Sequence, residues 1–155
     1  MSNHQRTAAW LAACGLKPGN PENLSTQIGC DIEEVVELLQ CIECSMTEGQ
    51  LRAMGEALGV LQNVATALKA GRLMARIAPG KEAEFLDAIC DREVTGNGIA
   101  FLAGFDKDGA DKAVLDSNDA KLVDGKAVFV PGTKKIAKPE GWVAPDLTPF
   151  VAKEQ

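Results

Sequence analysis

The chain has 155 residues, of which 46% are hydrophobic and 25% charged, and its 22 acidic residues outnumber its 16 basic ones to give a net charge of −6. This composition predicts one soluble globular domain with a real core. It argues against binding to a nucleic-acid polymer, which needs a basic face, and no apolar run approaches the roughly 20 residues of a membrane span. Residues 1–6 lead into only a short apolar patch without a convincing cleavage site, so we expect a cytoplasmic protein that does not contact membranes.

Helical signals dominate the first three quarters of the chain. A short apolar helix is predicted over residues 7–16, and residues 17–21 break it with two prolines. A longer helix runs from about residue 25 to 44 or 45, with apolar residues on one face.

Thr47 is predicted to cap the next helix, because Gln50 stands three residues on and completes a capping box. This helix extends over residues 51–74. It contains Gly55 and Gly59, four residues apart, which either admit a closely packed helix or merely weaken this one. Further helices are predicted over residues 82–102 and 110–116, with a turn between them.

The character of the chain changes after residue 116. Segments 122–123 and 127–130 flank the turn pair Asp124-Gly125 and predict a short hairpin, and residues 131–149 form an irregular tail. No linker divides the chain. We therefore predict an all-α fold in a single domain over residues 1–155, with a helical core at about 7–116 and a tail at about 117–150.

The five cysteines, at positions 14, 30, 41, 44 and 90, are odd in number and irregularly spaced, which argues against a disulfide framework. Cys41 and Cys44 have the spacing of a zinc or redox pair. Since they fall inside a helical pattern, without a second pair and with His4 as the only histidine, small buried thiols are the simpler interpretation.

Two of the predicted helices carry ridges of carboxylates. At about 100° per residue, the first ridge spans an arc of roughly 100° and the second an arc of roughly 60°. The first ridge consists of Glu33, Glu34 and Glu37, and the second of Glu84, Asp87 and Asp91.

Carboxylates so close together repel one another unless a cation lies among them. Two such ridges would make an all-oxygen site for a hard divalent cation, which takes a few protein carboxylates together with substrate phosphates. Either ridge alone could instead be a solvated helix face. In the second ridge the acids alternate with apolar residues such as Phe85 and Ile89, which makes burial without a partner costly.

The tail offers groups that suit phosphate oxygens. Ser117 and Asn118 are hydrogen-bond donors, and the lysines are positively charged donors, although lysines in a tail are often solvated surface. These lysines are Lys121, Lys134, Lys135 and Lys138. Trp10 and Trp142 are candidates for stacking on a base, or else packing residues.

The order of these motifs resembles one enzyme superfamily. Glu33-Glu34-x-x-Glu37 followed by Glu84-x-x-Asp87 resembles the EExxE and ExxD motifs of the all-α nucleoside triphosphate pyrophosphohydrolases. Residues 86–106, Ser117-Asn118 with Lys121, and residues 132–147 are similar to the MazG-like branch of phages and bacteria in particular. The resemblance covers about residues 25–150.

The resemblance implies a bundle of four to five helices that hydrolyses a nucleoside triphosphate between its α and β phosphates. The monophosphate and pyrophosphate are the products, Mg²⁺ or Mn²⁺ is the cofactor, and the host is a bacterium or a phage-infected cell. The implied metal ligands are Glu34, Glu37, Glu84 and Asp87, with Glu33 as an auxiliary acid and Asp91 as an auxiliary acid or further ligand. The implied nucleotide contacts are Ser117, Asn118, Lys121 and Lys138.

The gap between Glu37 and Glu84 is longer than is usual for these motifs. We interpret it as an additional helix, inserted between the two acidic helices over residues 48–74. Related proteins form helical homodimers or homotetramers, and dGTP or GTP is a first hypothesis for the substrate. The alternatives are a non-catalytic nucleotide- or metal-binding regulatory module, a phosphoribosyl-ATP pyrophosphohydrolase and, last, a zinc protein built on Cys41 and Cys44.

Overall fold

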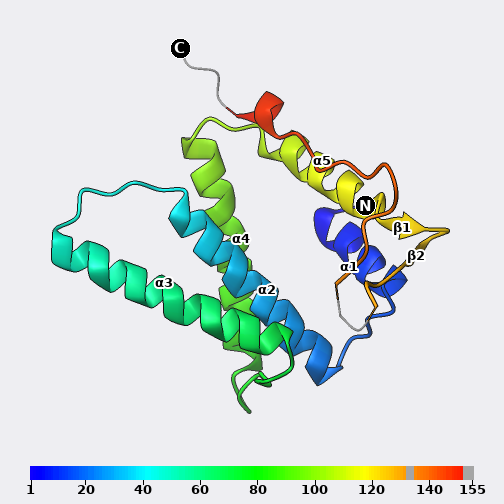
Figure 1. Ribbon diagram of the computed structural model, residues 1–155, viewed down its shortest axis with the longest axis horizontal. Helices are drawn as coiled ribbons and strands as arrows, with labels where there is room; N and C mark the ends of the chain where they lie inside the picture. The colour runs from blue at the N-terminus through cyan, green and yellow to red at the C-terminus, as the bar shows by residue number, and fades with distance from the viewer. Residues whose placement is uncertain (132–134, 152–155) are drawn as a thin grey trace. The chain divides into compact units, whose positions relative to one another are not determined.

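The computed structural model describes residues 1–131 and 135–151 (Figure 1). Within these ranges it has five α-helices, a two-stranded hairpin and one 3₁₀ turn. The helices are α1 (Asn3–Ala13), α2 (Pro21–Gln40), α3 (Glu48–Lys69), α4 (Glu82–Leu102) and α5 (Lys107–Asp119). The remaining elements are β1 (Leu122–Val123), β2 (Lys126–Ala127) and η1 (Thr148–Phe150). The predicted all-α class with a short hairpin and an irregular tail is confirmed.

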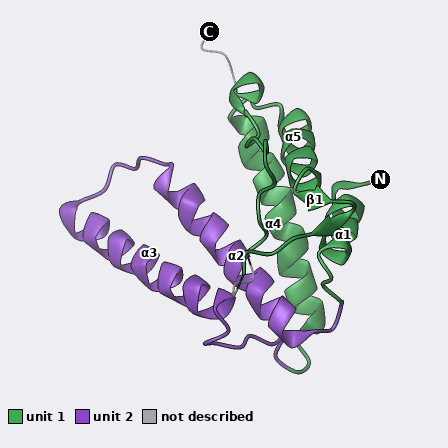
Figure 2. Ribbon diagram, turned by 45° about the vertical axis from the view of Figure 1, so that its right-hand side comes forward, with its two compact units in different colours: residues 1–17, 79–155 green, residues 18–78 purple. Residues whose placement is uncertain are grey.

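The chain forms two compact units (Figure 2). Unit 1 comprises residues 1–17 and 79–155, and unit 2 comprises residues 18–78. Both crossings fall at Pro-Gly pairs, Pro18-Gly19 and Pro79-Gly80, and both glycines have a positive φ that residues with a side chain rarely adopt. Unit 2 thus contains the first acidic ridge, and unit 1 contains the second ridge and the tail.

Unit 2 is a pair of packed helices, α2 and α3, joined by residues 41–47. Its small core includes Val36, Ala65 and Leu68, all buried. Gly29 lies where the helices come closest, since a Cβ built there would be 2.8 Å from the Ala65 carbonyl oxygen and 3.1 Å from the Leu68 Cβ. The interpreted insertion is therefore a helix, and it packs on the helix that carries the first ridge.

The glycine that permits close packing is not one of the pair singled out in the sequence. A Cβ at Gly55 or Gly59 would meet nothing within 4 Å. Of the two interpretations, weak points in an exposed helix therefore describe these positions, because the contact with α2 lies nearer the C-terminal end of α3, around Ala65.

Three helices begin earlier than their hydrophobic periodicity predicts: α1 before residue 7, α2 before residue 25 and α5 before residue 110. In each case a side chain outside the helix accepts a hydrogen bond from a first-turn N–H group that has no partner within the helix. The capping residues are Ser2 for α1, Asn20 for α2 and Asp106 for α5.

Three helices end earlier than predicted, and α1 is one of them, since it stops at Ala13 rather than at residue 16. α3 stops at Lys69, and Gly71 follows with a φ of 69°, a common way to terminate a helix. α2 stops at Gln40, although the apolar repeat continues to Ile42, whose side chain is 52% exposed. Cys41 and Cys44 consequently lie beyond the helix and are exposed, so the expectation of buried thiols is wrong.

In unit 1, α1 and the tail are both fixed to α5. Arg6 on α1 forms ion pairs with Asp116 and Asp119, at 2.8 and 2.6 Å. At the other end of α5, the Asp106 N–H donates to the Phe150 carbonyl at 2.9 Å, and the Phe150 ring lies so close to Gly109 that no side chain would fit there. The tail is therefore ordered against α5 at its η1 end.

The predicted hairpin is present, but its second strand is Lys126–Ala127 rather than residues 127–130, and Phe129 forms a bridge with Ile136 of the tail. Leu122 pairs with Ala127 and Val123 with Lys126, and the turn between them is Asp124-Gly125, both with positive φ. Two mirror-type turn residues match the natural twist of a tight hairpin.

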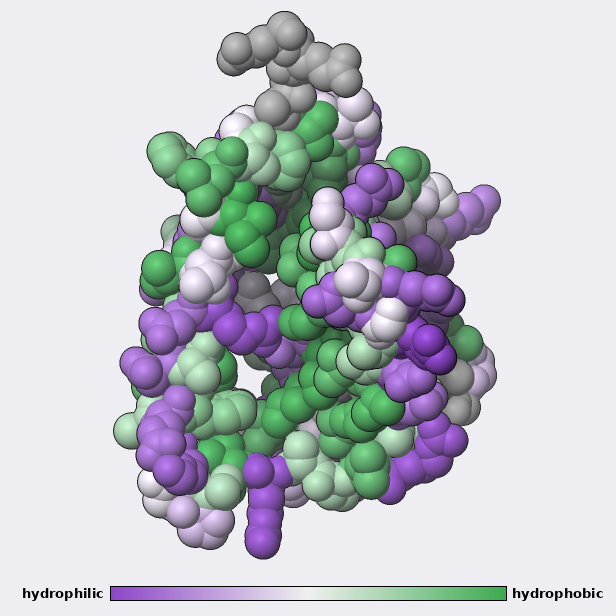
Figure 3. Space-filling view, turned by 90° about the vertical axis from the view of Figure 1, so that its left-hand side faces the viewer, coloured by the Kyte–Doolittle hydropathy of each residue, from purple (hydrophilic) through white to green (hydrophobic). Residues whose placement is uncertain are grey.

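α4 differs from the other long helices, because it has no buried residue although it is rich in apolar ones. Phe101 and Leu102 near its end are 81% and 85% exposed. The space-filling view likewise shows hydrophobic side chains interleaved with hydrophilic ones at the surface (Figure 3). Across the two described ranges, no helix combines the length and the apolar character needed to cross a bilayer.

Candidate phosphate-binding site and acidic ridges

Unit 1 brings together the four residues that the tail motif predicts to contact the nucleotide. Ser117 and Asn118 lie in the last turn of α5, and Lys121 follows the end of that helix. Lys138 comes from the tail and meets Lys121 over the ring of Trp142. We call the group the lysine corner: Ser117, Asn118, Lys121, Lys138 and Trp142.

Two ammonium groups share the indole of Trp142. Lys138 Nζ is 4.2 Å and Lys121 Nζ 5.3 Å from the ring centroid. Both distances are within the roughly 6 Å over which the ring quadrupole attracts a cation. The tail residue Trp142 thereby links a lysine that follows α5 to a lysine of the tail.

Both tryptophans also complete the C-terminal end of α5, whose last carbonyl groups have no partner within the helix. Trp142 Nε1 donates to the Ser117 carbonyl at 2.9 Å, and Trp10 Nε1 donates to the Asn118 carbonyl at 2.9 Å. Each indole N–H is therefore engaged in packing within unit 1. Stacking of either ring on a base stays a prediction.

Lys121 is in an unfavourable place for its charge. Burial lowers its pKa, and the positive charge of Lys138 lowers it further, while Cys14 acts in the opposite direction. Its Nζ donates to the Asn118 Oδ1 at 2.8 Å, a neutral acceptor. Among the described residues neither Lys121 nor Lys138 forms an ion pair with a carboxylate. An anion bound at the lysine corner would supply the missing counter-charge.

Ser117 adds a second unsatisfied group. Its Oγ is buried and finds no hydrogen-bond partner in the parts of the chain that the structure describes. Buried hydroxyls without a partner are uncommon, because the group loses its hydrogen bonds to water. The lysine corner thus contains two cations and one hydroxyl that a phosphate could satisfy.

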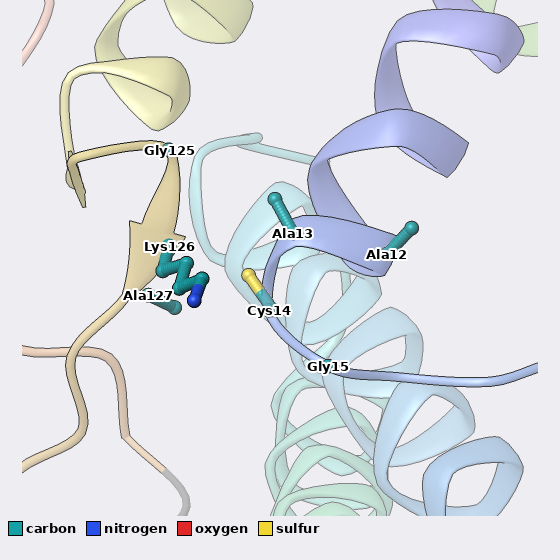
Figure 4. Close-up of a pocket in the computed structure, with 7 residues that line it drawn as sticks. All are labelled: Ala12, Ala13, Cys14, Gly15, Gly125, Lys126 and Ala127. Atoms are coloured by element: carbon teal, nitrogen blue, oxygen red, sulfur yellow. The ribbon is translucent and has the colours of Figure 1, made fainter.

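A hollow of about 420 Å³ lies next to this group, between residues 12–15 at the end of α1 and residues 125–127 of the hairpin (Figure 4). It is lined by small residues, the ammonium of Lys126 and the buried thiol of Cys14. Burial raises the pKa of the Cys14 thiol and the charge of Lys121 opposes that rise, so Cys14 lies within electrostatic reach of the lysine corner. Alanine and glycine carry no chemical signal, which is why the sequence did not indicate this hollow.

The first acidic ridge lies on α2 in unit 2. Glu33 forms an ion pair with Lys69 of α3. Glu34 and Glu37 are exposed, and among the described residues neither has an ion-pair partner. Partial burial raises the pKa of Glu34, and the negative charges of Glu37 and Glu33 raise it further. A divalent cation would relieve this repulsion, and carboxylate oxygens are ligands that suit the Mg²⁺ or Mn²⁺ implied by the resemblance.

The second acidic ridge lies on α4 in unit 1. Lys81 Nζ contacts both carboxylate oxygens of Glu84, at 2.6 and 2.7 Å, and both side chains are largely exposed. Asp87 and Asp91 are exposed too. The apolar residues between these acids therefore leave all three carboxylates exposed.

The predicted nucleotide contacts lie together within unit 1, whereas the predicted metal ligands are divided between the two units. Within either unit, the described residues contain no group of three His, Cys, Asp or Glu side chains arranged to hold a metal ion. The meeting of the two ridges stays a prediction, because each ridge belongs to a different unit. Lys134 lies outside the described residues, and the Lys135 carbonyl accepts a hydrogen bond from the Val130 N–H at 2.8 Å.

Comparison with known proteins finds no matching family model, no matching curated protein and no matching solved structure.

Proposed function

We propose that the chain is a MazG-like, metal-dependent nucleoside triphosphate pyrophosphohydrolase, a hydrolase of acid anhydrides. The observation that carries the proposal is the lysine corner. Four residues named from a tail motif, and separated by up to 21 positions in the sequence, lie together. Among the described residues the ammonium groups of its two lysines have no ion-pair partner, and the buried Ser117 hydroxyl has no hydrogen-bond partner.

In this proposal the lysine corner binds the phosphate chain. Lys121 and Lys138 offset the charge that develops on the departing pyrophosphate, and Ser117 and Asn118 orient it. Glu34, Glu37, Glu84 and Asp87 would hold Mg²⁺ or Mn²⁺, which supplies electrophilic activation of the phosphoryl group.

Glu33 and Asp91 have supporting roles in the proposal. The ion pair with Lys69 engages Glu33, so we assign it to orienting the ridge, as an auxiliary acid. Asp91 is exposed one turn beyond Asp87, where it can act as an auxiliary acid or a further ligand.

The proposal is tested with a panel of common ribo- and deoxyribonucleoside triphosphates in the presence of Mg²⁺ or Mn²⁺, with dGTP and GTP as the first candidates. We expect monophosphate and pyrophosphate, resolved by chromatography. Diphosphate and orthophosphate would mean that a different bond is cleaved. Melting points raised by nucleotides without turnover would instead indicate the non-catalytic module, and turnover of phosphoribosyl-ATP alone would indicate that specialised substrate.

We also propose that the protein is a homodimer or homotetramer. α4 supports this, because it is a 21-residue helix without a buried residue. Exposed apolar surface of this extent is usually covered by a partner.

A further inference from the structure

We propose that Trp142 is a positioning residue, whose indole holds the ammonium groups of Lys121 and Lys138 as a two-point clamp for the phosphate oxygens of a diphosphate or triphosphate. The clamp takes its ligand class from the proposed function, and so rests on it. The role is distinct from stacking on a base, because the ring is already approached by two cations.

The tail is shaped to present Lys138 to the ring. Residues 139–142 form a tight turn, in which the Trp142 N–H donates to the Pro139 carbonyl at 3.1 Å. Gly141 has a φ of 78°, a conformation that a turn of this kind requires at its third position. The turn reverses the direction of the chain between Lys138 and Trp142. As a result, the ammonium group of Lys138 lies over the indole of Trp142.

The ring is itself fixed to α5. Its Nε1–H is bonded to the Ser117 carbonyl, so the indole cannot rotate away without leaving a helix-end carbonyl unsatisfied. Lys121 is held from a second side by Asn118, because its ammonium donates to that amide oxygen. Two flexible side chains are thereby restrained in advance, which lowers the entropy lost when they bind an anion.

The charges favour an anion over any other ligand. Two ammonium groups approach one ring centroid, at 4.2 and 5.3 Å, and their positive charges repel each other. No carboxylate of the described residues pairs with either. The Ser117 Oγ of the same corner is buried and has no hydrogen-bond partner in the same ranges. An anion with oxygens on neighbouring phosphorus atoms can satisfy both ammonium groups together.

The test measures the affinity of the full-length protein for inorganic pyrophosphate by titration calorimetry, with EDTA present so that the acidic ridges cannot contribute through a metal. We expect Trp142→Leu to weaken binding about tenfold, and Trp142→Phe to recover part of the loss because a smaller ring still attracts cations. Trp10→Leu is the matched control. It removes an indole that caps the neighbouring carbonyl but has no described lysine over its ring, so it should change the affinity less than twofold.

A double-mutant cycle separates positioning from general packing. If Trp142 acts through Lys138, then Lys138→Met should weaken pyrophosphate binding in the parent protein but have little further effect in Trp142→Leu. Additive losses would mean that the indole does not act through this lysine, and affinity within twofold of the parent for Trp142→Leu would overturn the proposal.

Two further readouts keep the outcome clear. Should Trp142→Leu fail to fold, as judged by circular dichroism, Trp10→Phe leaves Trp142 as the only tryptophan, and its emission should change with pyrophosphate. An unchanged emission together with unaltered affinity in Lys138→Met would overturn the clamp. Turnover of a triphosphate with no loss of pyrophosphate affinity in Trp142→Leu refutes the clamp alone, whereas binding through Trp142 without turnover of any triphosphate refutes the proposed catalysis alone.

Discussion

Replacement of Gly29 by alanine tests the packing that places the first acidic ridge. A methyl group at this position would lie 2.8 Å from the Ala65 carbonyl oxygen, 2.9 Å from the Lys69 Cγ and 3.1 Å from the Leu68 Cβ. The first of these is a backbone atom and cannot turn aside, so α3 has to move away from α2. Lys69 is also the partner of Glu33, so the shift would reach the ridge itself.

The magnitude follows from two opposing effects. Alanine is favoured over glycine in a helix by about 1 kcal/mol, whereas overpacking of a close contact costs about 1–3 kcal/mol. We therefore expect Gly29→Ala to lower the free energy of unfolding by about 1 kcal/mol. Gly59→Ala is the matched control, because a Cβ there meets nothing within 4 Å, and it should raise the free energy of unfolding by up to about 1 kcal/mol.

The assay is urea denaturation followed by circular dichroism, supported by thermal melting. A difference of about 2 kcal/mol between the two variants corresponds to a gap of roughly 4–8 °C for a chain of this size. If Gly29→Ala were stabilised as much as Gly59→Ala, α2 and α3 would not approach each other at Gly29, and the account of unit 2 would be refuted.

Three further predictions concern the ridges and α4. Glu37→Gln and Asp87→Asn should each abolish triphosphate turnover with melting points within a few degrees of the parent, and unchanged turnover in both would remove the ridges from the site. Glu34→Gln should raise the melting temperature at pH 7 without divalent cations. The raised pKa of Glu34 means that its charged form is disfavoured in the folded protein. The gain in melting temperature should therefore grow as the pH rises through that pKa, and it should vanish below about pH 4, where the carboxyl is protonated in both the folded and the unfolded state. A gain that does not depend on pH would contradict this cause. Phe101→Glu on α4 should lower the mass measured by light scattering, and a monomeric parent would refute the proposed oligomer.

Much of the secondary structure followed from local signals. The Thr47–Gln50 capping box begins α3 as predicted, and the Asp124-Gly125 pair makes the hairpin turn. The N-terminal ends of α1 and α2 had local signals as well, in the capping residues Ser2 and Asn20. Hydrophobic periodicity alone did not show these signals, because a cap lies outside the apolar pattern.

At the lysine corner, the sequence predicted which residues take part, and the tertiary structure showed how they contact one another. The resemblance of the tail motif predicts Ser117, Asn118, Lys121 and Lys138 as nucleotide contacts, and those residue types suit a phosphate. Nothing in their spacing indicated that Trp142 joins two of them, because that contact depends on a turn at Gly141 and on the path of the tail along α5.

By itself, the amino-acid sequence determined the helical class, the existence of a helix between the two acidic helices, the hairpin and the members of both ridges, because these depend on residues close together in the chain. Only the tertiary structure decided that Gly29 rather than Gly55 or Gly59 is the point of close packing, and that Cys41 and Cys44 are exposed. The spacing of the glycines and the chemistry of the thiols are the same whether these residues are packed or exposed. Whether such a residue is packed or exposed depends on which side chains, distant in the sequence, contact it, and packing between the helices and strands decides that.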